Sequence, residues 1–391
     1  MPESLLRCAL VTMAPFPVGN VSTIRFSSYM QTLAKLGFFS YILVYCPTTM
    51  ARKIHNRFGV FNGIHYQYAT KITWKSDCFF EKLIYLVVGL VKSLYYLKKE
   101  RINTVILYGD NYLIVTLFFF IVCKFLGIRF IGDRSELPSI AERNSKYKSF
   151  VYEKKQKLFD GMIVMTKRLK DFYSMIFPNN DSLFFLPMTI DPDRFKNIVK
   201  EQVSKPYIAV VFGTHNRDGL EESLKAFAVY KNELKGSFNL VLVGDYMNMP
   251  NKKTLDDLIQ RNQLNDFVEI KGLVQNDLVP QILKNASCLL TTPNFYVSGG
   301  FPTKLGEYML SGVPIVATSA GELLDYVVPN KELLMCSVGN VEEIAKNISY
   351  VEKNSDQCER MSRKAFDKAS TVFNADTYKI ELVKFLKGAY T

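Results

Sequence analysis

Short apolar runs alternate along the whole chain with longer segments in which apolar residues recur at helical spacing. Buried parallel strands are continuous apolar runs, and the helices that cover them carry an apolar stripe. The alternation is therefore typical of βαβ units around parallel sheets. The strands that we expect are LRCALVTM, SYILVYC, TVILYG, RFIGD, GMIVMT and SLFFLP in the first half, and PYIAVVFG, FNLVLVGD, DFVEIKG, ASCLLTTP, VPIVAT and ELLMCS in the second.

The length of 391 residues exceeds one ordinary core, so two domains are expected. A polar segment with three prolines separates the two sets of strands. We predict an α/β fold with two doubly wound, Rossmann-like sheets that face a cleft, because ligands of such sheets bind at the carboxyl ends of the strands. The predicted parts are a first domain over 1–190, a linker over 191–205, a second domain over 206–354, and helices over 355–391 that pack back across the boundary.

The charge of the chain is divided unequally. The net charge is +12, and residues 1–181 hold 25 Lys and Arg against 12 Asp and Glu, whereas the remainder holds 24 against 25. No helix-turn-helix, zinc-finger or RNP-like motif accompanies the basic half, so nucleic acid is not expected as a partner. An anionic membrane surface or a phosphorylated acceptor fits this charge. Solubility alone is the alternative.

Two apolar stretches raise the question of a membrane span. KLIYLVVGLVKSLYYL (82–97) is interrupted by Lys92, and YLIVTLFFFIVC (112–123) is too short for a hydrocarbon core of about 30 Å. We expect both to be buried helices. Seven cysteines without a C-x-x-C pair favour a reducing compartment. A cytoplasmic protein is expected, with peripheral attachment to the inner membrane face as an open alternative.

The stretch NFYVSGGFPTKLGEYMLSGVPIVAT (294–318) combines a glycine-containing loop, a helix and a strand. Lys304 to Leu310 are helix formers, Gly312 is a suitable helix end, and VPIVAT is a buried-strand pattern. A loop that leads into a helix N-terminus presents N–H groups and the positive end of the helix dipole, which together suit a phosphate or carboxylate. Glu307, one turn into the helix, is placed to accept hydrogen bonds from sugar hydroxyls.

Three further polar segments follow predicted strands: APFPVGNVSTIR (14–25), GDRSELPS (132–139) and GTHNRDG (213–219). With GFPTKLGEYMLSGVPIVAT, which is the most specific of the four, the chain resembles the family-4 retaining glycosyltransferases of the GT-B fold over nearly its whole length. The likeness is strongest to bacterial members that act in capsule, O-antigen and exopolysaccharide assembly. It implies a UDP- or GDP-sugar donor on the second domain and a glycan or lipid-linked saccharide acceptor on the first.

Carried over to this sequence, Glu307 matches the second glutamate of the family's E-x7-E signature, which binds the nucleotide ribose. Gly299 stands where the first glutamate is expected. The chain thus departs from the family there, and backbone N–H groups are the contacts that the loop still offers to the sugar. Lys304 supplies a point charge for the diphosphate. The donor-binding residues that the resemblance implies in this stretch are Gly299, Gly300, Phe301, Thr303, Lys304 and Glu307.

Two other segments are implied to contact the donor. Arg217 occupies the place of a basic residue that precedes an acidic-Gly pair and contacts the pyrophosphate, a role that a guanidinium suits. Gly19 and Asn20 lie in PFPVGN, which matches the family's glycine-containing loop, and are implied to bring backbone amides toward the sugar phosphate.

The acceptor residues are expected on the first domain. Asp133 and Glu136 follow a predicted strand and are the candidates to orient or deprotonate the acceptor hydroxyl. For Glu136 the alternative is local pairing with Arg134. Arg25 binds an acceptor phosphate or merely covers the surface of its helix, and the sequence leaves both open.

The chemistry implied by the resemblance needs neither a metal nor a cofactor, because cations and amides can stabilise the charge that develops on the leaving diphosphate. The DPD at 191–193 resembles a metal-binding D-x-D motif but lies in the linker, so we interpret it as structural. Two alternatives to a transferase stay open. One is a non-catalytic subunit that binds a nucleotide-sugar for a partner, suggested by Gly299. The other is a UDP-sugar 2-epimerase, whose histidine and carboxylate set is not found among three histidines.

Overall fold

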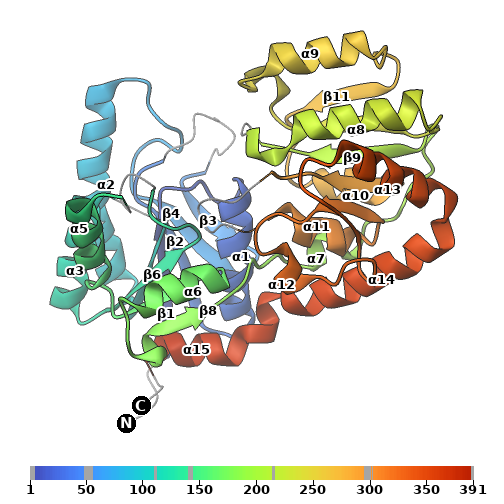
Figure 1. The fold of residues 1–391 in the computed structure, drawn as a ribbon. Helices are drawn as coiled ribbons and strands as arrows, with labels where there is room; N and C mark the ends of the chain where they lie inside the picture. Colours follow the sequence, from blue (N-terminus) through green and yellow to red (C-terminus); the bar gives the residue numbers. More distant parts are fainter. Residues whose placement is uncertain are drawn as a thin grey trace. The chain divides into compact units, whose positions relative to one another are not determined.

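The computed structural model describes residues 5–47, 56–109, 112–139, 144–213, 216–294, 301 and 303–388. The chain divides into two units (Figure 1). Unit 1 consists of Met1–Asp191 and Asn374–Thr391, and unit 2 consists of Pro192–Phe373. Each unit is an α/β structure around its own sheet, as the sequence predicts.

Unit 1 is built on an eight-stranded sheet with the order β3-β4-β2-β1-β5-β6-β7-β8. All neighbours pair in parallel except β3 and β4, which are antiparallel. The central strands are buried along their whole length because helices cover both faces. The strands are β1 (Arg7–Thr12), β2 (Phe39–Val44), β3 (Phe58–Phe61), β4 (Ile64–Tyr68), β5 (Thr104–Tyr108), β6 (Arg129–Arg134), β7 (Gly161–Val164) and β8 (Leu183–Phe185).

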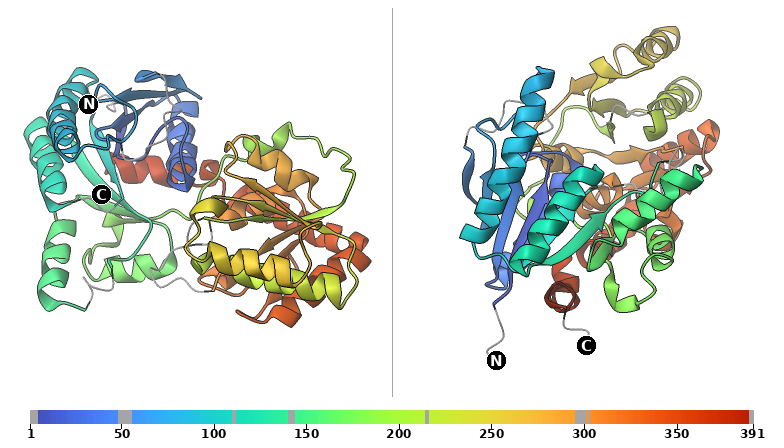
Figure 2. Two further views of the ribbon diagram at one scale, coloured as in Figure 1. Left: turned by 90° about the horizontal axis from the view of Figure 1, so that it is seen from above. Right: turned by 90° about the vertical axis from the view of Figure 1, so that its left-hand side faces the viewer.

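The helices of unit 1 cover the sheet in two layers (Figure 2). α1 and α15 pack on one face, where their apolar side chains join a single buried cluster with alternate residues of the strands. α2, α3 and α5 lie on the other face, with α3 between α2 and α5. The helices are α1 (Val21–Lys35), α2 (Phe79–Lys99), α3 (Leu113–Leu126), α5 (Lys146–Gln156), α6 (Lys167–Ser174) and α15 (Lys379–Lys387), with short 3-10 turns η1 (Asn180–Ser182) and η4 (Ala375–Tyr378).

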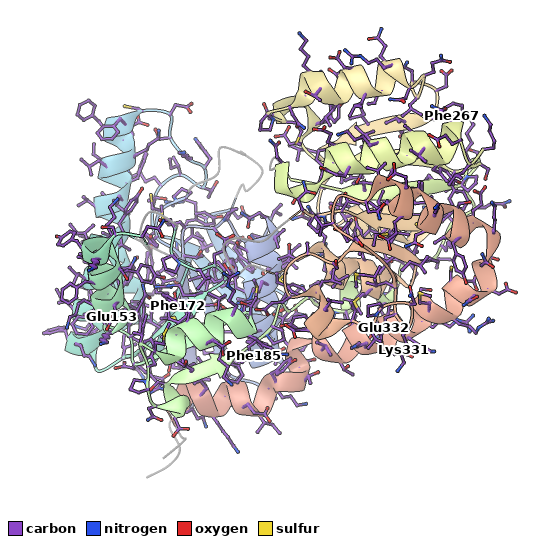
Figure 3. The ribbon with its side chains drawn as sticks, in the orientation of Figure 1. Glu153, Phe172, Phe185, Phe267, Lys331 and Glu332 are labelled. Carbon is purple, nitrogen blue, oxygen red and sulfur yellow. The ribbon has the colours of Figure 1, made fainter. Side chains whose placement is uncertain are left out.

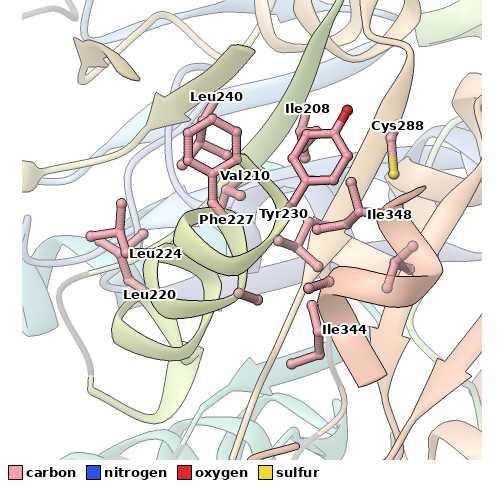
Figure 4. Close-up of a cluster of buried hydrophobic side chains, with 14 of the residues drawn as sticks. Ile208, Val210, Leu220, Leu224, Phe227, Tyr230, Leu240, Cys288, Ile344 and Ile348 are labelled. Atoms are coloured by element: carbon pink, nitrogen blue, oxygen red, sulfur yellow. The ribbon is translucent and has the colours of Figure 1, made fainter. Parts of the chain in front are cut away.

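Unit 2 has a six-stranded, wholly parallel sheet with the order β11-β10-β9-β12-β13-β14. Its core joins the apolar stripes of α8 and α13 to the central strands (Figure 4). The strands are β9 (Tyr207–Val211), β10 (Asn239–Val243), β11 (Val268–Gly272), β12 (Cys288–Thr291), β13 (Ile315–Thr318) and β14 (Leu334–Cys336). The helices are α7 (Asp193–Lys196), α8 (Leu220–Asn232), α9 (Lys252–Arg261), α10 (Val279–Asn285), α11 (Lys304–Ser311), α12 (Leu323–Tyr326), α13 (Val341–Lys353) and α14 (Ser355–Val372), with 3-10 turns η2 (Asn216–Asp218) and η3 (Tyr246–Asn248).

Each of the twelve expected strands corresponds to a strand of the structure, and two doubly wound sheets are confirmed. The sequence analysis missed β3 and β4, a hairpin at the edge of the first sheet. Its turn is Asn62-Gly63, where both residues have positive φ (49° and 78°), the conformation that tight hairpin turns need. The hairpin was missed because β3 is only 4 residues long and contains Gly59, and because β4 alternates apolar and polar side chains, so neither resembles a long buried run.

The C-terminal segment belongs to both units. α14 contacts α11 and α13 and so stays with unit 2, and only Asn374–Thr391 belong to unit 1. There α15 packs against α1 and β6. Phe385 is fully buried and its ring stacks on that of Phe184, with centroids 5.3 Å apart. Unit 1 therefore depends on residues from the end of the chain.

The two apolar stretches proposed as buried helices are helical, but their burial was predicted wrongly. They fall in α2 and α3, and seven apolar side chains of α2 are more than half exposed. Within the described chain, no other element covers the outer face of either helix. Among the described residues, no helix combines the length and the apolar character that a bilayer span requires.

We predict that Phe385→Ala lowers the free energy of unfolding by about 3 to 5 kcal/mol, because it removes a buried ring that holds α15 on the sheet. Chemical denaturation of the full chain is the measurement. Ile380→Ala on the same helix is the control, since Ile380 is exposed and its truncation should change stability by no more than about 0.5 kcal/mol. Equal losses for the two variants would contradict this docking of α15.

Candidate functional site

The candidate donor site lies at the carboxyl edge of the unit 2 sheet. β9 and β12 are neighbours and pair in parallel, so the segments that follow them emerge side by side. The Thr292 hydroxyl donates to the Gly219 carbonyl oxygen at 2.6 Å. Gly219 has a φ of 71°, and a Cβ there would lie 1.6 Å from the Thr292 carbonyl oxygen. Only glycine fits this position, which begins α8 beside the loop that leads to α11.

Lys304, the first residue of α11, is held by Asp218. Its ammonium lies 2.8 Å from Asp218 Oδ2, and the Gly213 backbone N–H donates to the same oxygen. The two side chains are 20 % and 12 % exposed, so the pair is accessible at one side. Asp218 thereby links the end of β9 to the start of α11. A lysine ammonium carries a full positive charge and three N–H donors, which suit a phosphate as well as a carboxylate.

Glu307, in the first turn of α11, pairs with Arg194 on α7. The distance from Arg194 Nη1 to Glu307 Oε1 is 2.5 Å, and Arg194 Nη2 donates to the Asn276 carbonyl oxygen at 2.7 Å. The arginine is 20 % and the glutamate 12 % exposed. One guanidinium thus joins α7, the loop after β11 and α11. Because Arg194 holds one carboxylate oxygen, it orients the other.

Tyr308 fixes α11 to the sheet. It is buried, its hydroxyl accepts a hydrogen bond from the Val211 N–H at 2.8 Å, and it lies 3.4 Å from the Leu290 carbonyl oxygen. Burial raises the pKa of the Tyr308 phenol, so this hydroxyl stays protonated. β9, β12 and α11 are therefore joined at the same edge that carries Lys304 and Glu307.

The other predicted donor residues are described only in part. Gly299 and Gly300 lie outside the described residues, as does the side chain of Arg217, whose backbone is part of η2. Phe301 is buried, and its ring packs against Tyr326 with centroids 4.8 Å apart. It therefore anchors the end of the loop through its side chain. Thr303 is the residue that precedes α11, and its side chain makes no capping hydrogen bond.

The expected glycine loop of unit 1 follows β1. A Cβ on Gly19 would lie 2.0 Å from Thr23 Oγ1 and 2.7 Å from the Pro15 carbonyl oxygen, so glycine is required here by local packing. The Asn20 side chain accepts hydrogen bonds from the Ser22 and Thr23 N–H groups and begins α1. Gly19 is thus explained by the packing of the loop, and Asn20 by its capping of α1. Their contact with a donor stays a prediction.

Arg25 and Asp133 form a fully buried ion pair within unit 1. Arg25 Nη1 lies 2.6 Å from Asp133 Oδ2, Nη2 donates to the Leu186 carbonyl oxygen at 3.0 Å, and the Tyr29 hydroxyl donates to the same Asp133 oxygen at 2.8 Å. The exposed fractions of Arg25 and Asp133 are 1 % and 0 %. Burial, and then the charge of Asp133, raises the pKa of Tyr29 well above its ordinary value. This burial favours a structural role over the predicted contact of Asp133 and Arg25 with an acceptor.

Glu136 is exposed in the bend after β6, unlike Asp133. Arg134, which follows Asp133 in the chain, is buried. It donates to the Gly109 and Leu107 carbonyl oxygens and to Gln156. Arg134 therefore ties β6 to β5 and α5. Of the two carboxylates predicted to act on an acceptor, Glu136 is the one that solvent reaches.

The structure thus brings Lys304 and Glu307 together on α11, and it adds two partners that the sequence analysis did not single out. Asp218 was visible in the sequence as the acidic residue of GTHNRDG. Arg194 gave no local signal, because its contact with Glu307 joins residues far apart in the chain. Within the described ranges, no three His, Cys, Asp or Glu side chains are grouped so that they could hold a metal ion.

Residues 191–368, almost all of them in unit 2, match the family described as Glycosyl transferases group 1. A curated relative, the 2-deoxystreptamine glucosyltransferase of Streptomyces kanamyceticus, is 25 % identical over 177 residues, which are 42 % of this chain and 44 % of the relative. The match spans less than half of the relative's length.

Similar solved structures cover almost the whole chain. Sucrose-phosphate synthase from Thermosynechococcus elongatus has a TM-score of 0.75 at 13 % identity and covers 98 % of this chain and 99 % of its own. HepE from Anabaena, solved in complex with UDP-glucose, has a TM-score of 0.70 at 14 % identity, with 98 % and 100 % covered. At these identities the likeness shows the fold, which is the two-domain GT-B fold.

We predict that Asp133→Ala lowers the free energy of unfolding by about 3 to 5 kcal/mol, because it leaves the Arg25 guanidinium buried without its carboxylate. Urea denaturation of the full chain is the measurement. Glu136→Gln, three residues away and exposed, is the control and should change stability little. An Asp133→Ala protein that unfolds at the wild-type urea concentration would contradict the structural assignment.

Proposed function

We propose that this GT-B chain, whose residues 191–368 match the glycosyl transferases group 1, is a retaining hexosyltransferase that acts in surface polysaccharide biosynthesis. The donor is a nucleotide-sugar and the acceptor a glycan or lipid-linked saccharide. UDP is the first nucleotide to test, since HepE is described in complex with UDP and with UDP-glucose. Retention and the polysaccharide role rest on the sequence resemblance.

The observation that carries this proposal is the placement of Lys304 and Glu307 at the start of α11, each held by a partner of opposite charge. Residues held in one position lose little freedom when a ligand binds. Glu307 would accept from the ribose hydroxyls with the oxygen that Arg194 leaves available. Lys304 would present its positive charge to the diphosphate.

Transfer breaks the bond between the anomeric carbon and the diphosphate oxygen and forms a bond from that carbon to the acceptor oxygen. The nucleoside diphosphate leaves with the electron pair of the broken bond. Lys304 and Arg217 are proposed to stabilise the negative charge that grows there, without a metal. The acceptor proton moves to Glu136 or to the departing phosphate. Asp133 has a structural role instead, because it pairs with Arg25.

A second candidate function is a nucleotide-sugar-binding subunit without catalysis, because Gly299 replaces a side chain that the family uses at the sugar. Such a subunit would retain the contacts of Lys304 and Glu307 and would lack turnover.

The two candidates are separated by incubating the full chain with UDP- and GDP-sugars, with and without saccharide acceptors, and measuring free nucleoside diphosphate. A transferase releases UDP or GDP, and an acceptor accelerates the release. A binding subunit shows only ligand-dependent stabilisation, about 2.7 kcal/mol at a concentration 100 times Kd. If no nucleotide-sugar is consumed and none shifts thermal unfolding, the donor-site proposal is wrong.

We predict that Glu307→Ala weakens UDP binding about 10- to 150-fold, because a charged acceptor of the ribose hydroxyls is lost and such bonds contribute roughly 1.5 to 3 kcal/mol. Titration calorimetry measures the affinity. Glu342→Ala is a matched control, since Glu342 is an exposed glutamate in the first turn of α13 in the same unit. Unchanged affinity in a folded Glu307→Ala protein would refute the assignment.

Arg194→Lys extends this test to the partner of Glu307. Lysine keeps the charge but cannot hold Glu307 and the Asn276 carbonyl oxygen through a planar fork. We expect a smaller loss of UDP affinity than for Glu307→Ala. If Arg194 serves the fold alone, Arg194→Lys will lower stability and leave UDP affinity unchanged.

We predict that Lys304→Ala and Arg217→Ala lower kcat more than they weaken donor binding, because both charges are proposed to act on the leaving group in the transition state. Initial-rate kinetics with a nucleotide-sugar separate kcat from KM. Lys346→Ala, an exposed lysine of α13, is the control. A raised KM with unchanged kcat would limit both residues to ground-state binding.

A further inference from the structure

α2 carries a stripe of exposed apolar side chains on the side that faces away from the sheet. Gly89, Ser93 and Leu97 form its buried side. A Cβ on Gly89 would lie 1.8 Å from the Tyr45 carbonyl oxygen, so the helix is held close against the sheet at this point. Its outward side chains, each more than half exposed, are Phe79, Phe80, Leu83, Ile84, Val87, Val91 and Tyr95.

α3 continues this surface. It has apolar residues all round, a composition that usually marks a helix buried on every side. Here one side is open, and Phe125 at its end is 83 % exposed. The other exposed apolar side chains of α3 and the residue before it are Tyr112, Leu113, Ile114, Leu117 and Ile121. Contiguous apolar surface of this kind marks a binding interface on a folded protein.

α5 lies beside α3 and adds Tyr147 and Phe150 to the exposed apolar set. α2, α3 and α5 stand along one side of unit 1 in Figure 1 and in the left view of Figure 2. We call the exposed side chains of these three helices the α2–α3–α5 face. A cavity of about 360 Å³ opens near the N-terminal end of α2, and its lining includes Lys75 and two carboxylates, Asp77 and Glu81.

The charges on the three helices are almost all positive. Together they contain nine lysines, of which Lys155 is buried, and two acidic residues, Glu81 and Glu153, the second of which is labelled in Figure 3. Lys98 and Lys99 are exposed at the C-terminal end of α2, and Lys148 and Lys154 are exposed on α5. Long lysine side chains can lie along apolar surface and keep their ammonium groups in a polar layer.

Exposed apolar side chains and lysines on the same face favour one class of partner. A symmetric dimer through the α2–α3–α5 face would bring together two surfaces that both carry net positive charge, which is unfavourable. An anionic bilayer satisfies both features, since the interface takes up apolar and aromatic side chains while its headgroups attract lysines.

We propose that the α2–α3–α5 face of unit 1 is a membrane-binding surface that lies in the headgroup and acyl-chain boundary of an anionic bilayer. Apolar side chains of α2 and α3 enter the boundary, as those of interfacial helices do to a depth of about 5 to 10 Å. The lysines at the ends of the helices contact lipid phosphates and carboxylates. The proposal does not rest on the proposed transferase activity, and its test uses neither donor nor acceptor.

Co-sedimentation of the full chain with phosphatidylcholine vesicles, with and without phosphatidylglycerol, tests the apolar part. We expect binding to the anionic vesicles, and Ile84→Asp with Val91→Asp should weaken it at least about tenfold, because two side chains no longer enter the apolar boundary. Ile380→Asp with Leu273→Asp is the matched control, two exposed apolar residues outside the face. These variants should bind as wild type does.

The basic part is tested with Lys98→Gln and Lys99→Gln together. Loss of two lysines at an anionic surface, at about 1 kcal/mol each, should weaken binding about 30-fold at physiological salt. Lys170→Gln with Lys384→Gln, exposed lysines on α6 and α15, is the control and should have little effect.

Three results would overturn the proposal. They are no binding of wild type to anionic vesicles, binding that is the same for the Ile84/Val91 variant and its control, and a wild-type dimer in light scattering that the Ile84/Val91 substitutions dissociate. Thermal unfolding of each variant shows that the fold is intact, which the exposure of the substituted side chains leads us to expect.

Discussion

Parallel strand pairing is the constraint on which the arrangement of this chain depends. Neighbouring parallel strands end at the same edge of a sheet, so the segments that follow them are brought together without any local sequence signal. In unit 2 this pairing places the segments after β9 and β12 beside each other, and Asp218 and Lys304 meet there. In unit 1 it places β5 and β6 together, and Arg134 at the end of β6 bonds to carbonyl groups at the end of β5. In each unit, polar side chains from separate segments therefore meet at this edge of the sheet.

Burial separates the ion pairs of the two units into different physical roles. Arg25 and Asp133 are fully buried, and removing either partner would leave a buried charge without its counter-ion. The pairs Lys304–Asp218 and Arg194–Glu307 are partly exposed. A charge that is partly exposed can be shared with a ligand, whereas a fully buried one serves the fold. Because of this difference in burial, we propose Glu136 rather than Asp133 as the carboxylate that acts on the acceptor. The same difference supports Lys304 and Glu307 as the proposed donor-binding residues.

The sequence predicted the fold well because buried parallel strands leave a strong local pattern. PYIAVVFG or GMIVMT is recognisable from composition alone, and Gly312 has the left-handed conformation expected at the end of α11. The β3–β4 hairpin left a weaker pattern, since it lies at an edge and is partly polar. The burial of Arg25 and the contact of Arg194 with Glu307 could not be predicted, because both depend on residues more than a hundred positions away.

The exposed side of α2 and α3 shows a different limit of sequence patterns. An apolar residue on a helix predicts that water is excluded from it, but the pattern does not say whether protein or lipid does so. In α3 both the residues that face the sheet and those that face outward are mainly apolar. Only the packing of Phe119 against Tyr45 on one side, and the exposure of Phe125 on the other, distinguishes the core from the outer surface.

We propose that unit 2 binds the nucleotide of a sugar donor at the start of α11. Hydrogen exchange followed by mass spectrometry, on the full chain with and without saturating UDP, tests it most directly because it locates the ligand. Backbone amides that a bound nucleotide covers exchange more slowly. We expect UDP to slow exchange in peptides that contain Asn216–Asp218 and Thr303–Tyr308. Unchanged exchange in both segments under saturating UDP, or slowing confined to peptides of unit 1, would contradict this location of the nucleotide.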